Sequence, residues 1–473
     1  MPELLLADVG STFTKVCVVH TDEPRLLARA AVPTTTEPDV NQGLDAACRL
    51  AGTALDTALP LLASSSAAGG LRIAAVGLVP SLTAKAAEMA ALGAGAKVVG
   101  TFPYALNTDD ENRLRTLEPD LVLLTGGTDG GDTSHIVGNA EVITRTLPAV
   151  PVVVAGNRNA HDDLRRVLDG HQGPVRFADN VMPELNRLNL GPSRDCIRQL
   201  FLERIVIAKG MGRLKARADL LVPTPQAVLE AVRLLGQTAG GLGDFLAVDI
   251  GGATTDVYSH GAGLPSNAGV VYKGLPEPID KRTVEADLGM RHTLSGVMAL
   301  IDLEGLCAEH GLQPEEVMAW TTRVAADPGA IPHSTQETAA DTALAAAACR
   351  LAVQRHCGRL EEVWGPEGRV FLQEGKDLGD AGWVVGTGGP AAFGPAPEVI
   401  LAAARRRAGS ASLLPRAPRF LADRDYLLWA VGLLAQAGLD EAGARLALHH
   451  LREVPGGDAP SCRRVPEGTH RGE

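Results

Sequence analysis

The chain has 473 residues, of which 45% are hydrophobic and 21% charged, a balance typical of globular proteins and unlike that of disordered, collagen-like or small disulfide-rich chains. Its formal net charge of −12 argues against a nucleic-acid partner or an anionic membrane surface, because both bind basic faces. Seven scattered cysteines without a C-x-x-C pair, and no pattern typical of a signal peptide or a membrane-spanning segment, predict a reduced, soluble, cytoplasmic protein.

Short apolar runs separated by turn residues predict a β-meander at the start of the chain, with strands over 4–9, 15–20 and 25–32. A helix is expected over 41–59, where apolar residues have helical spacing. From residue 71 the two patterns alternate, with strands expected at 71–77, 97–100, 121–125, 152–155 and 175–178 and helices at 82–92, 111–117, 135–146 and 160–168. Such alternation predicts parallel strands joined by crossover helices.

The opening pattern returns in the second half of the chain. An apolar strand over 245–250, a glycine turn and a strand over 254–259 repeat the strand–turn–strand unit of residues 4–15, which indicates an internal duplication and two similar lobes. The other elements expected here are helices over 192–209, 225–236, 294–360, 397–408 and 425–450 and a strand over 383–385. Residues 453–473 are rich in Pro, Gly and charge, which predicts a disordered tail.

The first motif places a carboxylate, Asp8, at the end of a strand and several hydrogen-bond donors just beyond it. The donor residues are Gly10, Ser11, Thr12, Thr14 and Lys15. Their backbone amides, hydroxyls and ammonium group suit phosphate oxygens, and Asp8 suits a hydrated Mg²⁺, which prefers oxygen ligands. The alternative is an ordinary hairpin turn.

The second motif repeats this arrangement, with Asp249 at the end of a strand and a further carboxylate, Asp256, seven residues later. The turn residues between them that would bind phosphate are Gly251, Gly252, Thr254 and Thr255. This turn is neither a Walker loop nor a G-x-G-x-x-G segment that opens a helix. Two such turns facing each other would hold a polyphosphate and share a metal ion, with Asp8, Asp249 and Asp256 as the candidate ligands.

A third glycine cluster follows the strand at 383–385 and contains Gly386, Thr387, Gly388 and Gly389. Glycines permit close approach of the backbone to a flat ligand such as adenosine. A plain turn between a strand and a helix is the alternative for this cluster.

In this order, across two duplicated lobes, the three motifs resemble those of the actin, sugar-kinase and seventy-kilodalton heat-shock ATPase superfamily. The resemblance implies an α/β fold of two ribonuclease-H-like lobes with ATP and Mg²⁺ in the cleft between them. It implies an N-terminal lobe over 1–190 with an inserted α/β segment and a C-terminal lobe over 191–452. Asp8, Lys15 and Asp249 are then the expected catalytic residues. One departure is Ala253, where many members have a third glycine.

A narrower resemblance rests on LLTGGTDGGD at 123–132, AAGGL at 67–71, VGLVP at 76–80, VEADLGM at 284–290 and DYL at 425–427. These segments are similar to those of the glutamate mutase accessory family called GlmL or MutL, which is unrelated to the mismatch-repair protein of that name. Members are associated with adenosylcobalamin-dependent carbon-skeleton mutases, such as glutamate (methylaspartate) mutase, and are thought to reactivate them as ATP-driven chaperones. The resemblance implies a mutase subunit as partner, and a homodimer is one alternative for the oligomeric state.

Two features have competing interpretations. The turn over 125–132 would contact nucleotide phosphate through Gly126, Gly127 and Thr128, or would close a sheet edge. Glu285 and Asp287 would orient the attacking water, or would cap a helix or lie on a solvated face.

Several other activities use the same fold. A small-molecule kinase would need a general-base aspartate, for which Asp129 or Asp287 is available. A hydantoinase-like hydrolase shares the Asp-Ile-Gly-Gly-x-Thr-Thr-Asp turn. A radical-dehydratase activator would hold an iron–sulfur cluster between two subunits, for which the dispersed cysteines supply no obvious ligand set, and an actin-like filament would sediment with nucleotide.

Overall fold

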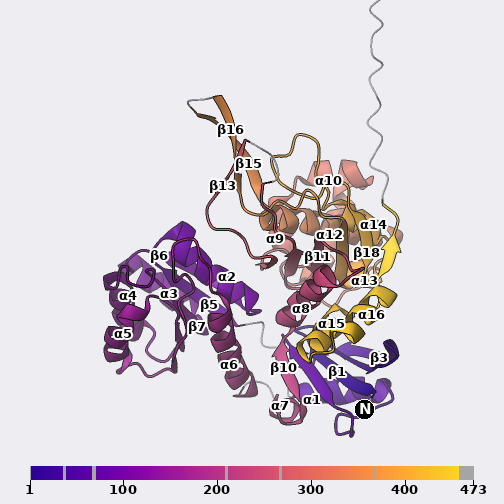
Figure 1. Cartoon of the computed structure of the whole chain (residues 1–473). Coiled ribbons are helices and arrows are strands. Elements are labelled where there is room, and N and C mark those ends of the chain that lie inside the picture. The colour runs from indigo at the N-terminus through magenta and orange to yellow at the C-terminus, as the bar shows by residue number, and fades with distance from the viewer. Residues whose placement is uncertain are drawn as a thin grey trace, which may run out of the picture.

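The structure is a computed structural model that describes residues 2–35, 39–66, 71–207, 211–265, 269–365 and 368–456. Most of the AAGGL segment (67–70) and most of the predicted tail (457–473) therefore lie outside the described residues. Figure 1 shows two sheet-bearing lobes on one side of the molecule and a separate α/β segment on the other.

The first sheet has the strand order β10-β4-β1-β2-β3. β1 pairs antiparallel with β2 and β2 with β3, whereas β4 runs parallel to β1 and β10 parallel to β4. The central strand β1 is buried at nearly every position, and the edge strand β3 alternates between exposed and half-buried residues, as expected when one of its faces meets water. The bounds are β1 Glu3–Val9, β2 Phe13–His20, β3 Arg25–Pro33, β4 Leu61–Ser65 and β10 Leu220–Pro223.

The second sheet repeats this topology, with the order β14-β12-β11-β17-β18-β19. Again three antiparallel strands, β11, β12 and β14, are followed by two parallel ones, β17 and β18. The shared strand order confirms the predicted internal duplication and the α/β fold of two ribonuclease-H-like lobes. The bounds are β11 Phe245–Ile250, β12 Thr255–His260, β14 Asp280–Glu285, β17 Trp383–Gly388, β18 Arg419–Ala422 and β19 Arg452–Val454.

Between β4 and β10 the chain forms a third sheet, of order β6-β5-β7-β8-β9, in which every pair of neighbours is parallel. The alternating strands and helices expected from residue 71 onward are therefore present. The strands are β5 Arg72–Gly77, β6 Lys97–Pro103, β7 Leu121–Leu124, β8 Val152–Val154 and β9 Val175–Phe177. The helices between them are η1 Pro80–Ala84, α2 Lys85–Gly93, α3 Thr108–Leu117, α4 Ser134–Thr146, η2 Arg158–Ala160 and α5 His161–Leu168.

Helices α8 (Thr224–Gln237) and α15 (Leu428–Gln436) lie between the two lobes' sheets (Figure 1). Their buried side chains join those of both sheets in one hydrophobic cluster, which includes Leu6 of β1, Leu235 of α8 and Phe245 of β11. Because this core is shared, apolar packing holds the two lobes together.

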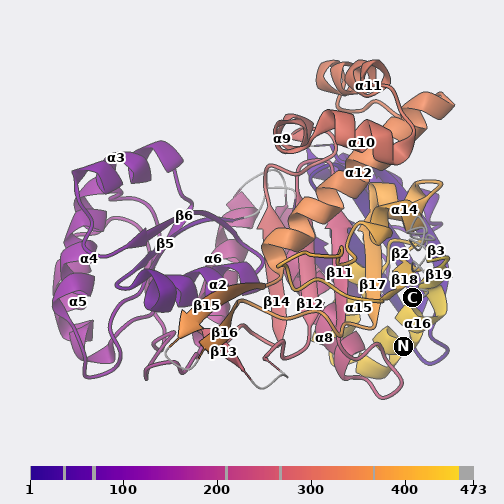
Figure 2. The ribbon, with the colours of Figure 1, turned by 90° about the horizontal axis from the view of Figure 1, so that it is seen from above.

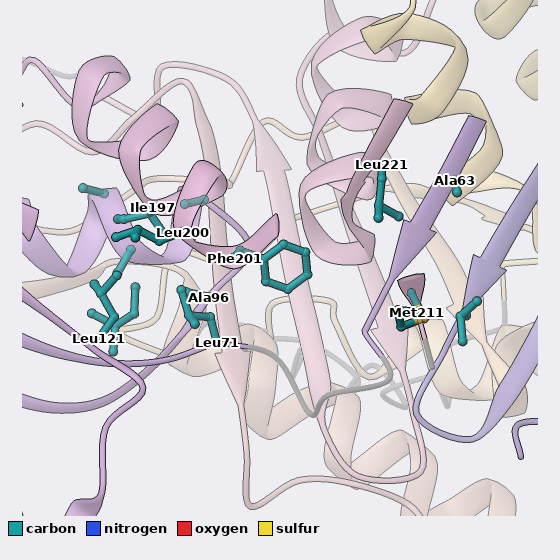
Figure 3. Packing of buried hydrophobic residues seen from close by; sticks show 14 of the residues in the cluster. Ala63, Leu71, Ala96, Leu121, Ile197, Leu200, Phe201, Met211 and Leu221 are labelled. Carbon is teal, nitrogen blue, oxygen red and sulfur yellow. The ribbon is translucent and has the colours of Figure 1, made fainter. Parts of the chain in front are cut away.

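Helix α6 (Gly191–Ile207) attaches the inserted segment to the first lobe. Its Ile197, Leu200 and Phe201 belong to the same buried cluster as Leu121 of the insert and Leu221 of β10 (Figure 3). The first sheet thus extends through β10, beyond the predicted lobe boundary at residues 190 and 191.

The remaining helices link the strands, and α16 packs against α8 and α15. They are α1 Val40–Leu50, α7 Gly212–Arg217, α9 Leu294–Leu300, α10 Leu303–His310, α11 Pro314–Ala326, α12 Thr335–His356, α13 Gly389–Phe393, α14 Pro397–Ala402 and α16 Asp440–His450. A further small sheet, β13-β16-β15, comprises Val270–Lys273, Gly368–Glu374 and Arg359–Gly365 and extends outward from the second lobe (Figure 1). None of the helices among the described residues is long and apolar enough to cross a membrane.

Several expectations differ from the structure. The helix expected over 41–59 ends at Leu50, because Gly52 adopts a left-handed conformation with φ of 71° and the chain then enters β4. The strand β19 includes residues 453 and 454, which were expected to be part of a disordered tail, because it pairs with β18. Strands this short have too few residues for their alternation to stand out in a sequence.

Helix α15 approaches α8 so closely that a Cβ atom on Gly432 would lie 1.6 Å from the carbonyl oxygen of Ala227. We predict that Gly432→Ala lowers the free energy of unfolding by about 1–3 kcal/mol through overpacking, measured by urea denaturation. The matched control is Gly138→Ala, also within a helix but with open space around it, which should raise stability by about 0.5–1 kcal/mol. Equal effects of the two substitutions would contradict this packing.

Candidate functional site

The two predicted turns have the same construction. The Gly10 amide donates to the carbonyl oxygen of Phe13, and the Gly251 amide donates to that of Thr254, at 3.0 and 2.9 Å. A Cβ atom at Gly10 would lie only 2.6 Å from the Phe13 oxygen. The tight β-hairpin therefore requires glycine at the first position.

The two hairpins face each other. A Cβ atom placed on Gly252 of the second hairpin would lie 3.7 Å from Oγ1 of Thr12 in the first. Asp8 and Lys15 are close enough to Asp249 to act electrostatically on its carboxyl group. The structure thus brings the two motifs together as the sequence predicts, and Ser11 and Thr12 are exposed there.

The carboxylate of Asp8 is completely buried and accepts three hydrogen bonds. Lys15 Nζ lies 2.7 Å from Oδ2, and Ser64 Oγ and Thr224 Oγ1 lie 2.8 and 2.5 Å from Oδ1. Both carboxylate oxygens are therefore occupied by protein donors. Ser64 and Thr224, on β4 and at the start of α8, were missed because no local pattern links them to Asp8.

Tyr426 completes the surroundings of Lys15, whose side chain is only 12% exposed. The Lys15 ammonium lies 4.0 Å from the centre of the Tyr426 ring, a cation–π contact. Burial, followed by the negative charges of Asp249 and Asp8, raises the pKa of Tyr426 well above its usual range, so its phenol stays neutral. Tyr426 also has a φ of 54°, a conformation uncommon for a non-glycine residue.

Asp249 differs from Asp8 because its Oδ1 atom is buried and has no hydrogen-bond partner within the described ranges. Burial, with the nearby Asp256 carboxylate as the next largest cause, raises the pKa of Asp249 to about 7. An unpartnered buried carboxylate oxygen is costly. It is the atom of this site that most needs a cation or a hydrogen-bond donor.

The third motif lies directly beside Asp249, because β11 pairs with β17 and places Asp249 opposite Thr387 and Ile250 opposite Gly388. A Cβ atom on Gly388, whose φ is 83°, would lie 2.3 Å from the Ile250 carbonyl oxygen and 2.7 Å from Asp249 Oδ1. Gly388 therefore permits the close approach of backbone to carboxylate.

Two other members of this motif have structural explanations. A Cβ atom on Gly386 would lie 2.7 Å from the side chain of Leu401 on α14, and the buried hydroxyl of Thr387 donates to Asp423 at 3.0 Å. Gly389, at the start of α13, has open space around its Cβ position. The expected turn is also shorter than predicted, because β17 continues through Gly388.

Asp256 is engaged by Arg282 of β14. Its Oδ1 accepts from Arg282 Nε and Nη2 at 2.9 and 2.6 Å, and its Oδ2 accepts from Thr254 at 3.1 Å. The same guanidinium donates through Nη1 to the carbonyl oxygens of Leu92 and Ala96, at 3.1 and 2.8 Å. Arg282, which sequence reasoning missed, thus joins the second hairpin to the end of α2 in the inserted segment.

The hydroxyls flanking the two turns have internal partners. Thr255 Oγ1 donates to the Leu288 carbonyl oxygen at 2.5 Å, and Thr14 Oγ1 lies 3.0 Å from Thr34 Oγ1. Both threonine side chains are buried. They stabilise the hairpins from within.

The glycine-rich turn at 125–132 belongs to the inserted segment, at the end of β7. Asn180 donates to the Gly127 carbonyl oxygen at 3.0 Å, and Asn157 donates to those of Gly131 and Asp132 at 3.1 and 3.0 Å. In both views the inserted segment lies to one side of β11 (Figures 1 and 2). The structure groups Gly126, Gly127 and Thr128 with this sheet edge rather than with the two hairpins.

The acidic pair of 285 and 287 is bound by one arginine. Arg355 lies 2.8 Å from Glu285 Oε2 and 2.8 Å from Asp287 Oδ1. Burial raises the pKa of Glu285, whereas the hydrogen bond from Arg355 lowers that of Asp287. Ion pairing with α12 therefore occupies both carboxylates.

Across the described part of the chain, no group of three or more His, Cys, Asp or Glu side chains is arranged to hold a metal ion. The predicted ligands Asp8 and Asp256 have protein partners on both oxygens. Asp249 is the member of the trio with a buried oxygen free. Because Mg²⁺ is commonly held by one or two carboxylates together with phosphate and water, these residues fit a nucleotide-bound Mg²⁺ through Asp249 better than a cage of three aspartates.

A family model described as MutL protein matches residues 4–451. The chain belongs to the MutL family. It is 39% identical over 480 residues to Protein MutL of Clostridium tetanomorphum, an alignment that covers 96% of this chain and 100% of that protein. The family identified from the sequence motifs is thereby confirmed.

Solved structures match this MutL family chain only remotely. Nucleotide-free acetone carboxylase matches 91% of this chain and 70% of its own, with 16% identity and a TM-score of 0.40. Diol dehydratase-reactivating factor in nucleotide-free form matches over 92% of this chain and 100% of its own, with 11% identity and a TM-score of 0.34. Glycerol dehydratase reactivase also matches over 92% of this chain and 100% of its own, with 11% identity and a TM-score of 0.32. The fold is therefore established by the strand order of the chain itself.

Removal of the Arg282 side chain should be strongly destabilising, because it leaves the Asp256 charge and two carbonyl oxygens without their buried donor. We predict that Arg282→Met lowers the free energy of unfolding by about 3–5 kcal/mol, measured by urea denaturation. Adding Asp256→Asn to this variant should restore part of the loss, since the unpaired charge is gone. Arg355→Met, which breaks a more exposed ion pair, should cost only about 0–1 kcal/mol; equal losses at the two arginines would refute the assignment.

Proposed function

We propose that this MutL family protein binds and hydrolyses ATP and uses the cycle to reactivate an adenosylcobalamin-dependent carbon-skeleton mutase, such as glutamate (methylaspartate) mutase. The observation that carries the ATP part is the pair of facing hairpins with a saturated Asp8 and an unpartnered Asp249. The mutase part rests on the family to which the chain belongs.

Different residues of the site would bind the phosphates and the metal ion. Ser64 and Thr224 hold the Asp8 carboxylate, which in turn holds the Lys15 ammonium beside the Tyr426 ring. The positive charge is thus positioned for phosphate oxygens before the nucleotide binds. The amides and hydroxyls of Ser11 and Thr12 lie exposed at the first turn. Asp249 is the residue that would hold Mg²⁺, which when bound neutralises phosphate charge during phosphoryl transfer.

Hydrolysis of ATP would change the number of contacts that the nucleotide makes between the two hairpins. Each hairpin belongs to a different lobe, and the lobes share the core around α8 and α15. A bound triphosphate contacts both turns, whereas its loss leaves each lobe with only the shared core. The second hairpin is joined to the inserted segment through Arg282, so that a change between the lobes reaches that segment directly.

We expect Asp249→Asn to lower ATP turnover by about 100-fold or more, because it removes the buried negative charge of the site. Turnover is measured as phosphate release with Mg²⁺ present. The same variant should unfold at an equal or higher urea concentration than the wild type, since an unpartnered buried charge is removed. Unchanged turnover, or loss of turnover together with a lower midpoint, would contradict the role given to Asp249.

The reactivation itself is tested with a purified mutase inactivated by bound cyanocobalamin. With ATP, Mg²⁺ and this protein, cyanocobalamin should be released and mutase activity should return on addition of adenosylcobalamin. ADP, or the Asp249→Asn variant with ATP, should give no more activity than mutase alone. Absence of stimulated exchange with the active wild-type ATPase would remove the mutase part of the proposal and leave ATP hydrolysis to be assigned to another process.

A further inference from the structure

The small sheet β13-β16-β15 carries an exposed aromatic side chain far from the hairpins. Trp364 of β15 is 80% exposed, and β15 and β16 extend outward from the second lobe (Figure 1). Tryptophan is among the residues most enriched at the centres of protein interfaces. A single exposed apolar side chain is common on protein surfaces, but one that belongs to a larger exposed apolar patch marks an interaction site.

The strand register places Trp364 on a continuous face. In the antiparallel pair, Trp364 is opposite Arg369, Glu362 opposite Phe371, and Leu360 opposite Gln373. Directly opposed residues share a face and every second residue along a strand returns to it. Trp364, Phe371 and Leu360 therefore form a diagonal apolar row from the outer part of the hairpin to its base. Glu362, Arg369 and Gln373 share this face, and the Arg369 guanidinium lies 5.4 Å from the centre of the Phe371 ring.

A cavity of about 610 Å³ runs along the inner part of this row. Its lining includes Leu360, Phe371 and Glu362 on the hairpin and Arg406, Arg407 and Arg416 from the opposing loop. A volume of this size suits a few side chains of a bound segment. The cavity and the Trp364 face together are here called the docking face.

The lining of the cavity contains more positive than negative side chains. It includes three arginines and one glutamate, although the chain as a whole carries a net charge of −12. Arg407 pairs with Glu309, and Arg416 with Asp380, while more than half of each arginine side chain stays exposed. Arg406 donates to the Ser410 carbonyl oxygen at 3.0 Å. Such a face attracts carboxylates.

The docking face is also linked to the nucleotide site through the backbone. β13 lies in the chain between β12 and β14, and the β15–β16 hairpin lies between α12 and β17. β12 begins at Thr255 beside the second hairpin, and β17 ends beside Asp249. The small sheet that bears Trp364 is thus connected along the chain to strands β12 and β17 of the sheet that carries Asp249.

We propose that the docking face binds an acidic segment of the mutase with at least one large apolar side chain, with Trp364 as the central contact and the Arg406 loop as the electrostatic one. This inference rests on the proposed function, since it names the surface by which that partner is engaged. The apolar row would contribute most of the affinity for the mutase segment, and the arginines would orient that segment through its carboxylates.

The test compares Trp364→Ala and Arg406→Glu in the full chain with wild type, using purified mutase as the probe and biolayer interferometry as the measurement. Trp364→Ala should weaken binding by about tenfold or more. Arg406→Glu should weaken it as well, with a larger effect at low ionic strength. The matched controls are Ile331→Ala, at another exposed apolar residue, and Arg165→Glu, at an exposed arginine of α5; both should bind within about twofold of wild type.

Three further readouts separate the outcomes. ATP turnover and the urea midpoint should stay at wild-type values in all four variants, because these side chains are exposed or half-buried and lie outside the β1–β2 and β11–β12 hairpins of the nucleotide site. If wild type binds the mutase and both docking-face variants bind equally well, the docking face is refuted while the proposed function stands. If wild type neither binds nor reactivates the mutase, both fall. If light scattering shows self-association that Trp364→Ala abolishes, the occupant is a second copy of this chain and the proposal is wrong.

Discussion

Burial of the Asp8 carboxylate is the constraint on which the architecture of the site depends. A charge with no exposed surface is costly unless it is paired and hydrogen-bonded. Here the donors come from three elements, Lys15 of β2, Ser64 of β4 and Thr224 at the start of α8. One carboxylate thus fixes the first hairpin, the parallel strand β4 and the helix α8, which enters the shared core. It also sets the position of the Lys15 ammonium group.

The second lobe has the same type of turn, but the aspartate before it has different hydrogen bonding. Asp249 occupies the place of Asp8 in the duplicated topology, yet its Oδ1 is buried without a partner among the residues described. Burial and the neighbouring Asp256 raise its pKa to about 7. One lobe therefore presents a satisfied, rigid group and the other an unsatisfied one. Such an asymmetry suits a site that is completed by a bound cation rather than by the protein itself.

Two sets of contacts connect the site to the rest of the molecule. The core around α8 and α15 joins the lobes through apolar packing. Arg282 joins the second hairpin to the inserted segment through four hydrogen bonds, two to Asp256 and two to carbonyl oxygens of the insert. Apolar contacts allow small sliding motions, but a buried guanidinium holds its acceptors in one geometry. Arg282 thus connects the inserted segment directly to the second hairpin, although that segment is inserted in the first lobe.

The sequence by itself determined the duplication, the two strand–turn–strand hairpins and the alternating strands and helices of the insert, because glycines at tight turns and runs of buried apolar residues leave local signals. It also indicated Asp8, Lys15 and Asp249 as neighbours, through the repetition of one motif. It did not reveal the short strands β4, β10 and β18, the donors Ser64 and Thr224, the ring of Tyr426 or the role of Arg282. It left open whether Gly126–Thr128 contact phosphate or close a sheet edge, and the structure places them at the end of β7 in the insert. It offered Asp256 as a metal ligand, whereas the structure pairs Asp256 with Arg282. Each of these depends on contacts between residues far apart in the chain, and such contacts are decided only when the sheets and helices have packed together.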